Sequence, residues 1–172
     1  MPDRVVLGID PGLANTGWGV IQASPGKLSA LAYGCVTTLS ETDRAERLHM
    51  IHTELTAVIE RYHPAELAIE AVYFGANVKS AMMTGEARGV ALLAAAENQM
   101  AVKEYSPTQV KQVVSGNGYA VKSQVQYMVK VFLHLRQLPQ PDHAADALAI
   151  AICHAQLQKN RWVVAENRGK KT

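Results

Sequence analysis

Two short hydrophobic runs that each end in an acidic residue constrain the fold of this chain more than any other feature of its sequence. Residues 4–9 lead directly into Asp10, and residues 67–69 lead into Glu70. Runs of this length and composition are typical of buried strands. Core packing does not explain an acid at the carboxyl end of such a strand, where α/β folds bind their ligands. Both acids are therefore candidate functional residues, with turn formation before Pro11 as the alternative role of Asp10.

The remaining hydrophobic patterns predict further strands and helices around these two runs. Pro25-Gly26 separates two strand-like runs, so the first three strands are expected to form a meander. Ser106 and Ser123 each lie three residues before a glutamine, which is the spacing of a helix N-cap. Strands are expected over 17–22, 31–38, 66–71 and 102–105, and helices over 43–62, 80–98, 106–114, 123–134 and 141–158.

Composition and charge favour one compact α/β domain with an uneven charge distribution. The chain has 172 residues, of which 48% are hydrophobic and 19% charged, and this excludes a disordered or fibrous chain. Residues 1–70 hold 5 basic and 9 acidic side chains, and residues 71–172 hold 12 and 6, giving formal charges of −4 and +6. This split indicates an acidic site that faces a basic surface, with scattered solvated charge as the alternative.

The hydrophobic pattern gives no indication of a membrane protein. The longest apolar stretches fall well short of the roughly 18 residues that cross a bilayer. Near the N-terminus, Asp3 and Arg4 stand in place of a hydrophobic leader, so we expect a cytoplasmic location. Cys35 and Cys153 lack the spacing of a metal site or a disulfide framework, and both are expected to be buried thiols.

Two segments have an unusual composition. The expected helix over 80–98 is rich in alanine, methionine and glycine, which fits either burial in the core or close approach of a second helix or subunit at Gly85 and Gly89. Residues 159–172 hold five basic residues and little that can pack. We therefore expect a domain over 1–158 and a flexible basic tail over 159–172.

A third acidic group lies at the start of the last expected helix. Asp142 and Asp146 are four residues apart and His143 and Asp146 are three apart, so a helix places their side chains on one face, roughly 5 to 6 Å apart at Cβ. Asp142 directly follows a proline and is the expected N-cap. Asp146 has apolar neighbours, and a lone carboxylate there is costly unless it is paired or binds a cation. His143 is either a surface histidine or a nitrogen ligand beside Asp146.

Asp10, Glu70 and Asp146 predict a definite chemistry if they converge. Carboxylates about 4 Å apart repel by about 4 kcal/mol at an effective dielectric of about 20, and divalent cations relieve this repulsion. Hard oxygen ligands suit Mg²⁺ or Mn²⁺, and two such ions roughly 3.5 to 4 Å apart activate water and stabilise the leaving oxygen of a phosphodiester. The charge split fits hydrolysis of a nucleic-acid backbone, because basic side chains would hold the phosphates around the acids.

Six short motifs occur in one order along the chain: GIDPG (8–12), AIE (68–70), ARGV (87–90), QVKQ (109–112), KSQVQ (122–126) and AADALAIA (144–151). Together they resemble the RuvC crossover junction endodeoxyribonucleases, and the resemblance spans about positions 4–157. The resemblance implies an RNase H-like fold, a mixed five-stranded sheet flanked by helices in a single domain. It also implies a homodimer that nicks two strands of like polarity on four-way junction DNA, resolving Holliday junctions in recombination and repair. The implied protein partners are the RuvA and RuvB branch-migration proteins.

The resemblance assigns the metal site residue by residue. The family's metal-binding acids fall on Asp10, Glu70 and Asp146, and the implied cofactor is Mg²⁺ or Mn²⁺. The family's fourth acidic position falls on His143, as it does in some other members. This exchange lowers the negative charge of the site and favours Mn²⁺. His143 is implied either to bind a metal ion or to carry a proton during attack.

The resemblance also implies contacts with DNA and with a second subunit. Tyr73 matches the family's base-contacting aromatic residue and Phe74 lies beside it. Stacking on an unpaired base is worth on the order of 1 to 3 kcal/mol, and hydrophobic anchoring of the loop is the alternative. Lys111 and Lys122 match DNA-contacting lysines. The helix expected over 80–98 corresponds to the family's dimer-forming helix.

Three other functions fit parts of the sequence. The pattern over 106–134 is helix-turn-helix-like and fits a DNA-binding module without catalysis, which leaves the three acids unexplained. Residues 10–12 near Thr16-Gly17 are similar to the phosphate-binding hairpin of sugar kinases and actin-like ATPases, but those proteins need two such domains. Another RNase H-like nuclease, one that cuts RNA in hybrids, fits the metal site alone.

Overall fold

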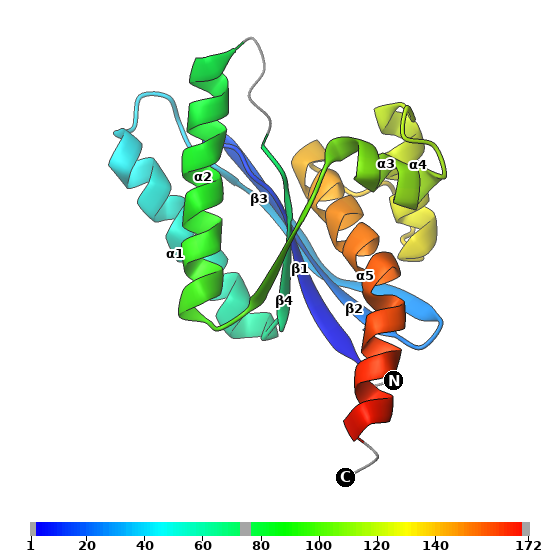
Figure 1. Ribbon diagram of the computed structural model, residues 1–172. Helices are drawn as coiled ribbons and strands as arrows, with labels where there is room; N and C mark the ends of the chain where they lie inside the picture. Colours follow the sequence, from blue (N-terminus) through cyan, green and yellow to red (C-terminus); the bar gives the residue numbers. More distant parts are fainter. Residues whose placement is uncertain (1–2, 73–76, 170–172) are drawn as a thin grey trace.

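The computed structural model describes residues 3–72 and 77–169 and shows a mixed five-stranded sheet between two layers of helices (Figure 1). The strands are β1 (Arg4–Asp10), β2 (Asn15–Ser24), β3 (Lys27–Thr37), β4 (Glu66–Glu70) and β5 (Ala101–Tyr105). They lie in the order β3-β2-β1-β4-β5. The first three form the predicted antiparallel meander, and β4 runs parallel to both β1 and β5. Ile9 pairs with Ile69, so the acids that follow them leave the sheet at the same edge.

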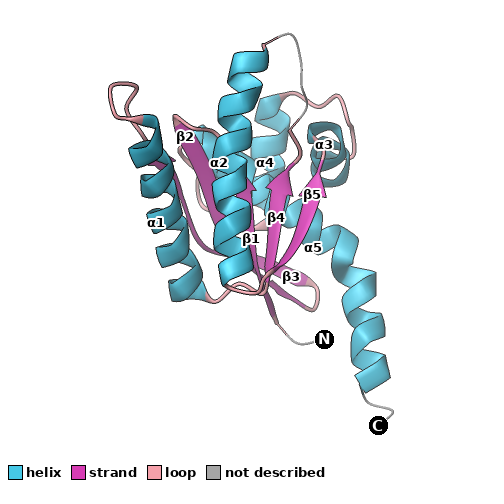
Figure 2. Cartoon of the chain, turned by 60° about the vertical axis from the view of Figure 1, so that its left-hand side comes forward, coloured by secondary structure: helices cyan, strands magenta, loops and turns pink. Residues whose placement is uncertain are grey.

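Helices cover both faces of this sheet (Figure 2). One face packs against α1 (Arg44–Tyr62) and α2 (Val78–Glu97), and the other against α3 (Pro107–Ser115), α4 (Lys122–Phe132) and α5 (Asp142–Gly169). The crossover between the parallel strands β4 and β5 contains α2, as in a βαβ unit. The predicted sheet flanked by helices is confirmed.

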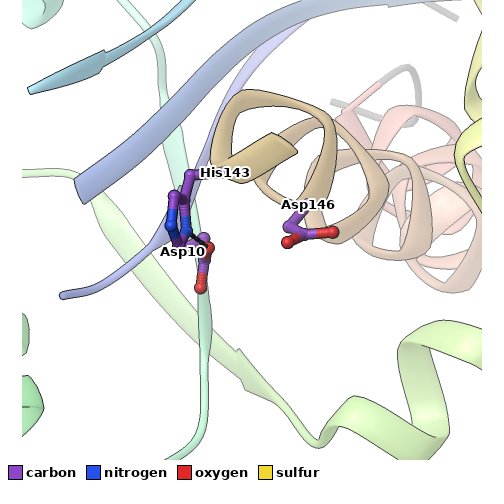
Figure 3. Close-up of side chains that lie close together, drawn as sticks. All are labelled: Asp10, His143 and Asp146. Carbon is purple, nitrogen blue, oxygen red and sulfur yellow. Dashed lines mark hydrogen bonds and ion pairs between the residues drawn. The ribbon is translucent and has the colours of Figure 1, made fainter. Parts of the chain in front are cut away.

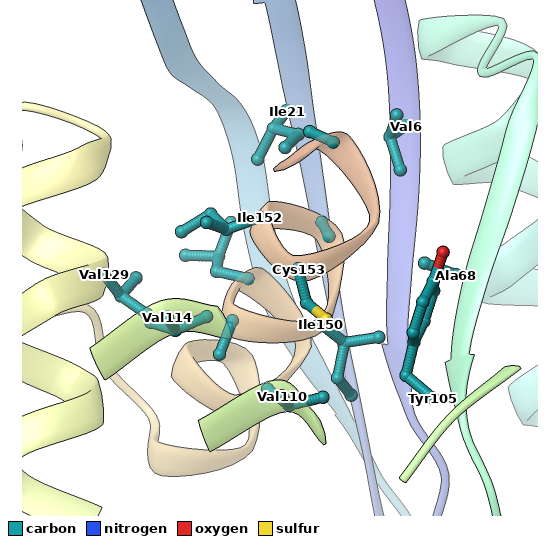
Figure 4. Packing of buried hydrophobic residues seen from close by; sticks show 14 of the residues in the cluster. Val6, Ile21, Ala68, Tyr105, Val110, Val114, Val129, Ile150, Ile152 and Cys153 are labelled. Atoms are coloured by element: carbon teal, nitrogen blue, oxygen red, sulfur yellow. The ribbon is translucent and has the colours of Figure 1, made fainter. Parts of the chain in front are cut away.

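The sheet separates two hydrophobic cores. Side chains alternate along β1, so Leu7 and Ile9 pack with α1 and α2, whereas Val6 faces α5 and packs in the cluster that contains Ile150 (Figure 4). The predicted helix-turn-helix-like segment belongs to this second core. Its buried side chains in this core are Val110, Val114, Ala120, Val125, Val129 and Leu133. Helices α3 and α4 are therefore packed as part of the same domain.

Glycines in β1 and β2 let α5 lie very close to the sheet. A Cβ atom at Gly8 would lie 2.1 Å from the Ala147 carbonyl oxygen, and one at Gly17 would lie 1.9 Å from the His143 carbonyl oxygen. Larger residues would push the helix away, because a closely packed interior has no free space. Gly17 pairs with Asp10 in the antiparallel register. The first turns of α5 are therefore held against the end of β1.

The two predicted serine caps differ in outcome. At the start of α3, the Gln109 N–H donates to Ser106 Oγ at 3.1 Å, as predicted. At the start of α4, Val121 occupies the N-cap position, so the prediction of Ser123 as the cap is wrong. The Val121 N–H donates to the Gln124 side chain at 3.2 Å. The helix therefore begins two residues earlier than the serine spacing predicts.

Helix α5 continues to Gly169, so the helix end predicted near Gln158 is wrong. Residues 159–168 contain no proline or glycine, and an established helix extends cooperatively through such residues. The division into a domain over 1–158 and a flexible basic tail over 159–172 stays a prediction. Neither α5 nor any other helix in the described part of the chain combines the length and apolar character needed to span a membrane.

The two cysteines are free thiols in different surroundings. Cys153 on α5 is buried, as predicted, and burial raises its pKa to about 12. Cys35 is partly exposed, so the prediction that it is buried is wrong. It belongs to β3, an edge strand with a neighbouring strand on one side only.

Candidate active site

Asp10, His143 and Asp146 meet where β1 ends against the first turns of α5 (Figure 3). Each offers one ligand atom, and these three atoms lie within 4.8 Å of one another. His143 Nδ1 and Asp10 Oδ2 are 2.8 Å apart. Because an ionised carboxylate only accepts hydrogen bonds, the ring donates its Nδ1 proton. His143 therefore contacts Asp10, besides lying one helical turn from Asp146 as the sequence predicts.

Glu70 lies at the end of β4 and lines the same cavity as Asp10 and Asp146. The cavity has a volume of about 260 Å³ and is also lined by Lys111 and Lys122. Among the described residues, the group of ligand atoms within 4.8 Å does not include Glu70. The structure thus brings the three predicted acids to one cavity, with two of them in a tighter group.

Burial and mutual repulsion disfavour negative charge on two of these acids. Burial raises the pKa of Glu70 to about 7, and the charges of Asp10 and Asp146 act in the same direction. Burial also raises the pKa of Asp10, where the hydrogen bond from His143 opposes the shift and the charge of Asp146 adds to it. A bound cation reverses this balance, because it stabilises ionised carboxylates. The site therefore favours binding of positive charge.

Both predicted lysines lie at this site. Lys122 Nζ is 3.1 Å from Asp146 Oδ2 and 3.2 Å from Asp142 Oδ2. Burial lowers the pKa of Lys122, but its hydrogen bonds and ion pairs with Asp146 and Asp142 outweigh burial and raise it. Lys111 lines the cavity, and its charge lowers the pKa of Glu70. The chain thus supplies two cationic side chains around its acidic group.

Asp142 differs from its predicted role as an N-cap. Helix α5 already includes Asp142, and the carbonyl of Pro141 accepts the first helical hydrogen bonds. The Asp142 carboxylate instead accepts from Gln126 Nε2 at 3.0 Å and pairs with Lys122. The hydrogen bonds from Lys122 and Gln126 hold its pKa below the usual value. Asp142 therefore connects α5 to α4.

Tyr73 and Phe74, the predicted base-contacting residues, lie outside the described residues. Strand β4 ends at Glu70, and the Ala71 N–H donates to the Tyr105 carbonyl at 2.9 Å, which fixes the start of this connection. The roles of both aromatic side chains stay predictions.

Sequence patterns do not reveal two features of this site. One is the close approach of His143 to Gly17; glycine within a strand pattern indicates such an approach, but not which element makes it. The other is the contact of Lys122 with Asp142 and Asp146, which comes from packing of α4 on α5. No local spacing indicates that contact.

The donor set fits a hard divalent cation. Carboxylate oxygens suit Mg²⁺, and the histidine nitrogen is acceptable to Mn²⁺. Ligands on opposite sides of a Mg²⁺ ion are about 4.2 Å apart, since each lies roughly 2.1 Å from the metal. The ligand atoms of Asp10, His143 and Asp146 lie within 4.8 Å of one another, a spacing close to this value, and could hold one ion together.

Known proteins with similar sequences are nucleases. The chain matches the family model described as crossover junction endodeoxyribonuclease RuvC over residues 6–154. It is 53% identical to RuvC of Heliobacterium modesticaldum over 88% of this chain and 93% of that protein. This chain belongs to the RuvC family. RuvC of Halothermothrix orenii is 47% identical over 87% of this chain and 91% of that protein.

Solved structures of RuvC proteins share the fold of this family member. The T. thermophilus RuvC in complex with Holliday junction substrate superposes with a TM-score of 0.85 and 39% identity, covering 90% of this chain and 94% of that chain. The yeast mitochondrial Holliday junction resolvase Ydc2, at 14% identity and a TM-score of 0.65, shares the fold alone. The predicted RNase H-like architecture is confirmed, and family membership excludes a DNA-binding module without catalysis.

Proposed function

We propose that this RuvC-family chain is a structure-specific endonuclease that resolves Holliday junctions by metal-dependent hydrolysis of phosphodiesters. The observation that carries the proposal is the convergence of Asp10, Glu70 and Asp146 on one cavity, with His143 bonded to Asp10. Eight relatives that are 43–53% identical are crossover junction endodeoxyribonucleases. The biological setting is DNA recombination and repair.

Asp10, Glu70, His143 and Asp146 are the proposed ligands of Mg²⁺ or Mn²⁺, with two ions in each site. When bound, such ions lower the pKa of water and stabilise the leaving oxygen of a phosphodiester. The protein holds the carboxylates on rigid elements, the end of β1, the end of β4 and the start of α5. The hydrogen bond from His143 orients Asp10 and favours its ionised form.

His143 is proposed to act as a metal ligand. A ring that donates its Nδ1 proton to Asp10 and carries no proton on Nε2 would offer the Nε2 lone pair to a metal ion. His143→Asp restores a fourth carboxylate and is expected to move the preference from Mn²⁺ toward Mg²⁺. The cleavage rate with each ion, measured across pH, checks this; unchanged metal and pH dependence would contradict both the ligand role and the proton-carrier role.

Lys111 and Lys122 are proposed to bind backbone phosphates, and Tyr73 and Phe74 to stack on bases near the crossover. Both lysines line the acidic cavity, so their ammonium groups lie beside the acids that a DNA strand must approach. Phosphate contacts of this kind position the duplex. They also make binding dependent on salt.

A second copy of the chain is proposed to bind along α2. A Cβ atom at Gly85 or Gly89 would meet no atom within 4 Å. On the same stripe Val78, Met82 and Leu93 are exposed by 57%, 56% and 53%. Small residues beside exposed apolar ones let another helix approach closely. A homodimer of this kind would present two sites to one junction and make paired, symmetric nicks.

RuvA and RuvB are the proposed protein partners, since branch migration moves the junction to the sequence that is cut. The cytoplasm is the proposed location, because the chromosomal DNA substrate lies there. Both proposals depend on membership of the RuvC family.

Asp10→Asn tests the proposed function. The variant is expected to bind a four-way junction with unchanged affinity in a gel-shift assay and to lose nicking, because the amide cannot replace a carboxylate ligand. Wild-type cleavage of a four-way junction, a linear duplex and an RNA–DNA hybrid separates a junction resolvase from other RNase H-like nucleases. Full nicking by the variant, or equal cleavage of all three substrates by the wild type, would contradict the proposal.

A further inference from the structure

The ion pairs of Lys122 place a cation of the protein itself at the metal site. Its ammonium group lies 3.1 Å from Asp146, one of the three residues whose ligand atoms lie close enough to share an ion. An ammonium group and a divalent ion that contact the same carboxylate repel each other strongly. Binding of the ion at Asp146 therefore weakens the contact of Lys122 with this carboxylate and favours its movement away.

Asp142 is placed to receive the ammonium group when it moves. Asp142 Oδ2 already lies 3.2 Å from Lys122 Nζ, so the shift needs no change in the backbone. The Asp142 side chain is 55% exposed and that of Asp146 35%, so Asp142 lies on the solvent side of the pair. Gln126, one turn after Lys122 on α4, donates to Asp142 at 3.0 Å and fixes its orientation.

We propose that Lys122 is an exchangeable counter-ion of Asp146, and that Asp142 is a positioning residue that retains the displaced ammonium group at the rim of the site. The inference rests on the proposed metal-dependent function. Before metal binding, Lys122 neutralises Asp146. After metal binding, Lys122 stays with Asp142 and presents its remaining N–H groups outward, where a DNA phosphate can accept them.

The first experiment measures the competition between Lys122 and the metal ion. Calorimetric titration of the DNA-free protein with Mn²⁺ is expected to show that Lys122→Met binds about threefold more tightly than the wild type, as removal of a partly exposed ion pair predicts. Lys130→Met is the matched control, since Lys130 also lies on α4 but does not line the cavity and takes no part in the ion pairs with Asp142 and Asp146. Equal Mn²⁺ affinity of the wild type and Lys122→Met would overturn the exchange.

The second experiment follows the lysine itself. NMR of lysine labelled with ¹³C at Cε, with the Lys122 signal assigned by its loss in Lys122→Met, is recorded with and without Mg²⁺. In the wild type, Mg²⁺ is expected to shift this signal while the side chain stays restricted. In Asp142→Asn, the Lys122 side chain is expected to be restricted in the absence of Mg²⁺. In the presence of Mg²⁺, it is expected to be as mobile as other surface lysines.

Glu97→Gln is the matched control for this measurement, because it removes a carboxylate of similar exposure, 48%, at the end of α2. It is expected to reproduce the wild-type signals. Equal mobility of Lys122 in the wild type and in Asp142→Asn after Mg²⁺ addition would overturn the role of Asp142. Failure of the wild type to bind Mg²⁺ or Mn²⁺ would contradict the proposed function as well, whereas binding without any change at Lys122 contradicts this inference alone.

Discussion

The two ends of the interface between α5 and the sheet use the same kinds of residue in opposite ways. At the start of the strands, Glu66 of β4 pairs with Arg4 of β1 at 3.3 Å and with His154 of α5 at 2.7 Å. His154 is fully buried, and the Tyr105 hydroxyl lies 2.9 Å from its other ring nitrogen. The acid at this end is neutralised by partners from the chain itself.

At the carboxyl end of the same strands, three acids line one cavity, and two of them have an ion-pair partner among the described residues. Asp10 of β1 has His143, and Asp146 of α5 has Lys122, while Glu70 of β4 keeps a pKa of about 7. A buried acid with its own counter-ions makes loss of either partner costly, whereas partly buried acids around one cavity repel one another until a cation binds. The comparison teaches that partners from the chain itself compensate the acid at one end, whereas the proposed chemistry belongs to the end whose acids repel one another.

The largest expected effect is a loss of cleavage activity from a variant at the acidic end, the carboxyl end of the strands. Asp146→Asn is expected to lower the rate of junction cleavage by about 1,000-fold, since loss of this proposed metal ligand would remove stabilisation of several kcal/mol from the transition state. Its free energy of unfolding is expected to stay near that of the wild type. Single-turnover cleavage and urea unfolding measure the two quantities. A large loss of stability with little loss of cleavage would reverse the comparison.

The second effect concerns the balanced end, the start of the strands where Glu66 pairs with Arg4 and His154. Glu66→Ala is expected to lower the free energy of unfolding by about 3 kcal/mol, because it removes the carboxylate that contacts both the buried His154 and the neighbouring Arg4. Urea unfolding measures the loss. Glu97→Ala, which removes an exposed carboxylate paired with His52, is the control and is expected to cost less than about 1 kcal/mol. Equal costs for the two variants would show that the buried pair has no special role.

The third effect tests the contact that holds the acidic end together. Gly17→Ala places a methyl group against the His143 carbonyl and is expected to lower cleavage more than tenfold and stability by about 2 kcal/mol, as overpacking does. Gly34→Ala is the control, because its Cβ would meet the Trp18 side chain instead of the α5 backbone. The control is expected to retain cleavage. Similar activity losses in both variants would disconnect the close approach from the site.

The smallest effect is a dependence of stability on pH. The pKa of Glu70 is raised from 4.5 to about 7, so the folded chain holds a proton that the unfolded chain releases, and stability falls as pH rises through this range. Glu70→Gln is expected to remove this fall in stability. At a pH above the pKa of Glu70, the metal-free variant is expected to be more stable than the wild type by about 1 kcal/mol. This is less than the free energy that corresponds to the whole pKa shift, because solvent enters the cavity. Mg²⁺ is expected to suppress the fall in the wild type.

Thermal unfolding of the metal-free and Mg²⁺-loaded proteins across this pH range measures that dependence. Glu66→Gln, at the balanced end of the same strand, serves as the comparison and is expected to be destabilised. A wild-type free energy of unfolding that rises with pH over this range would contradict the assignment of a raised pKa to Glu70.

Local patterns predicted most of the secondary structure correctly, and they placed three of the proposed site residues on the elements that bring them to one cavity. Strand-like runs that end at Asp10 and Glu70 and a helix that carries Asp146 depend on neighbours in the chain, and local propensity encodes them. The same reasoning failed at Ser123 and near Gln158. At Ser123, the Gln124 side chain accepts a hydrogen bond from Val121 and the helix begins earlier. Near Gln158, cooperative extension carries α5 past the predicted end.

The sequence by itself determined which side chains carry charge, which runs become strands or helices, and membership of the RuvC family. Only the tertiary structure decided which charges meet. Asp10 and His143 are 133 positions apart, and Lys122 reaches Asp146 from a different helix. Such distances are set by how closely α5 can approach the sheet and how α4 packs on α5. Packing between elements depends on the whole set of side chains at the contact, so no local spacing encodes it.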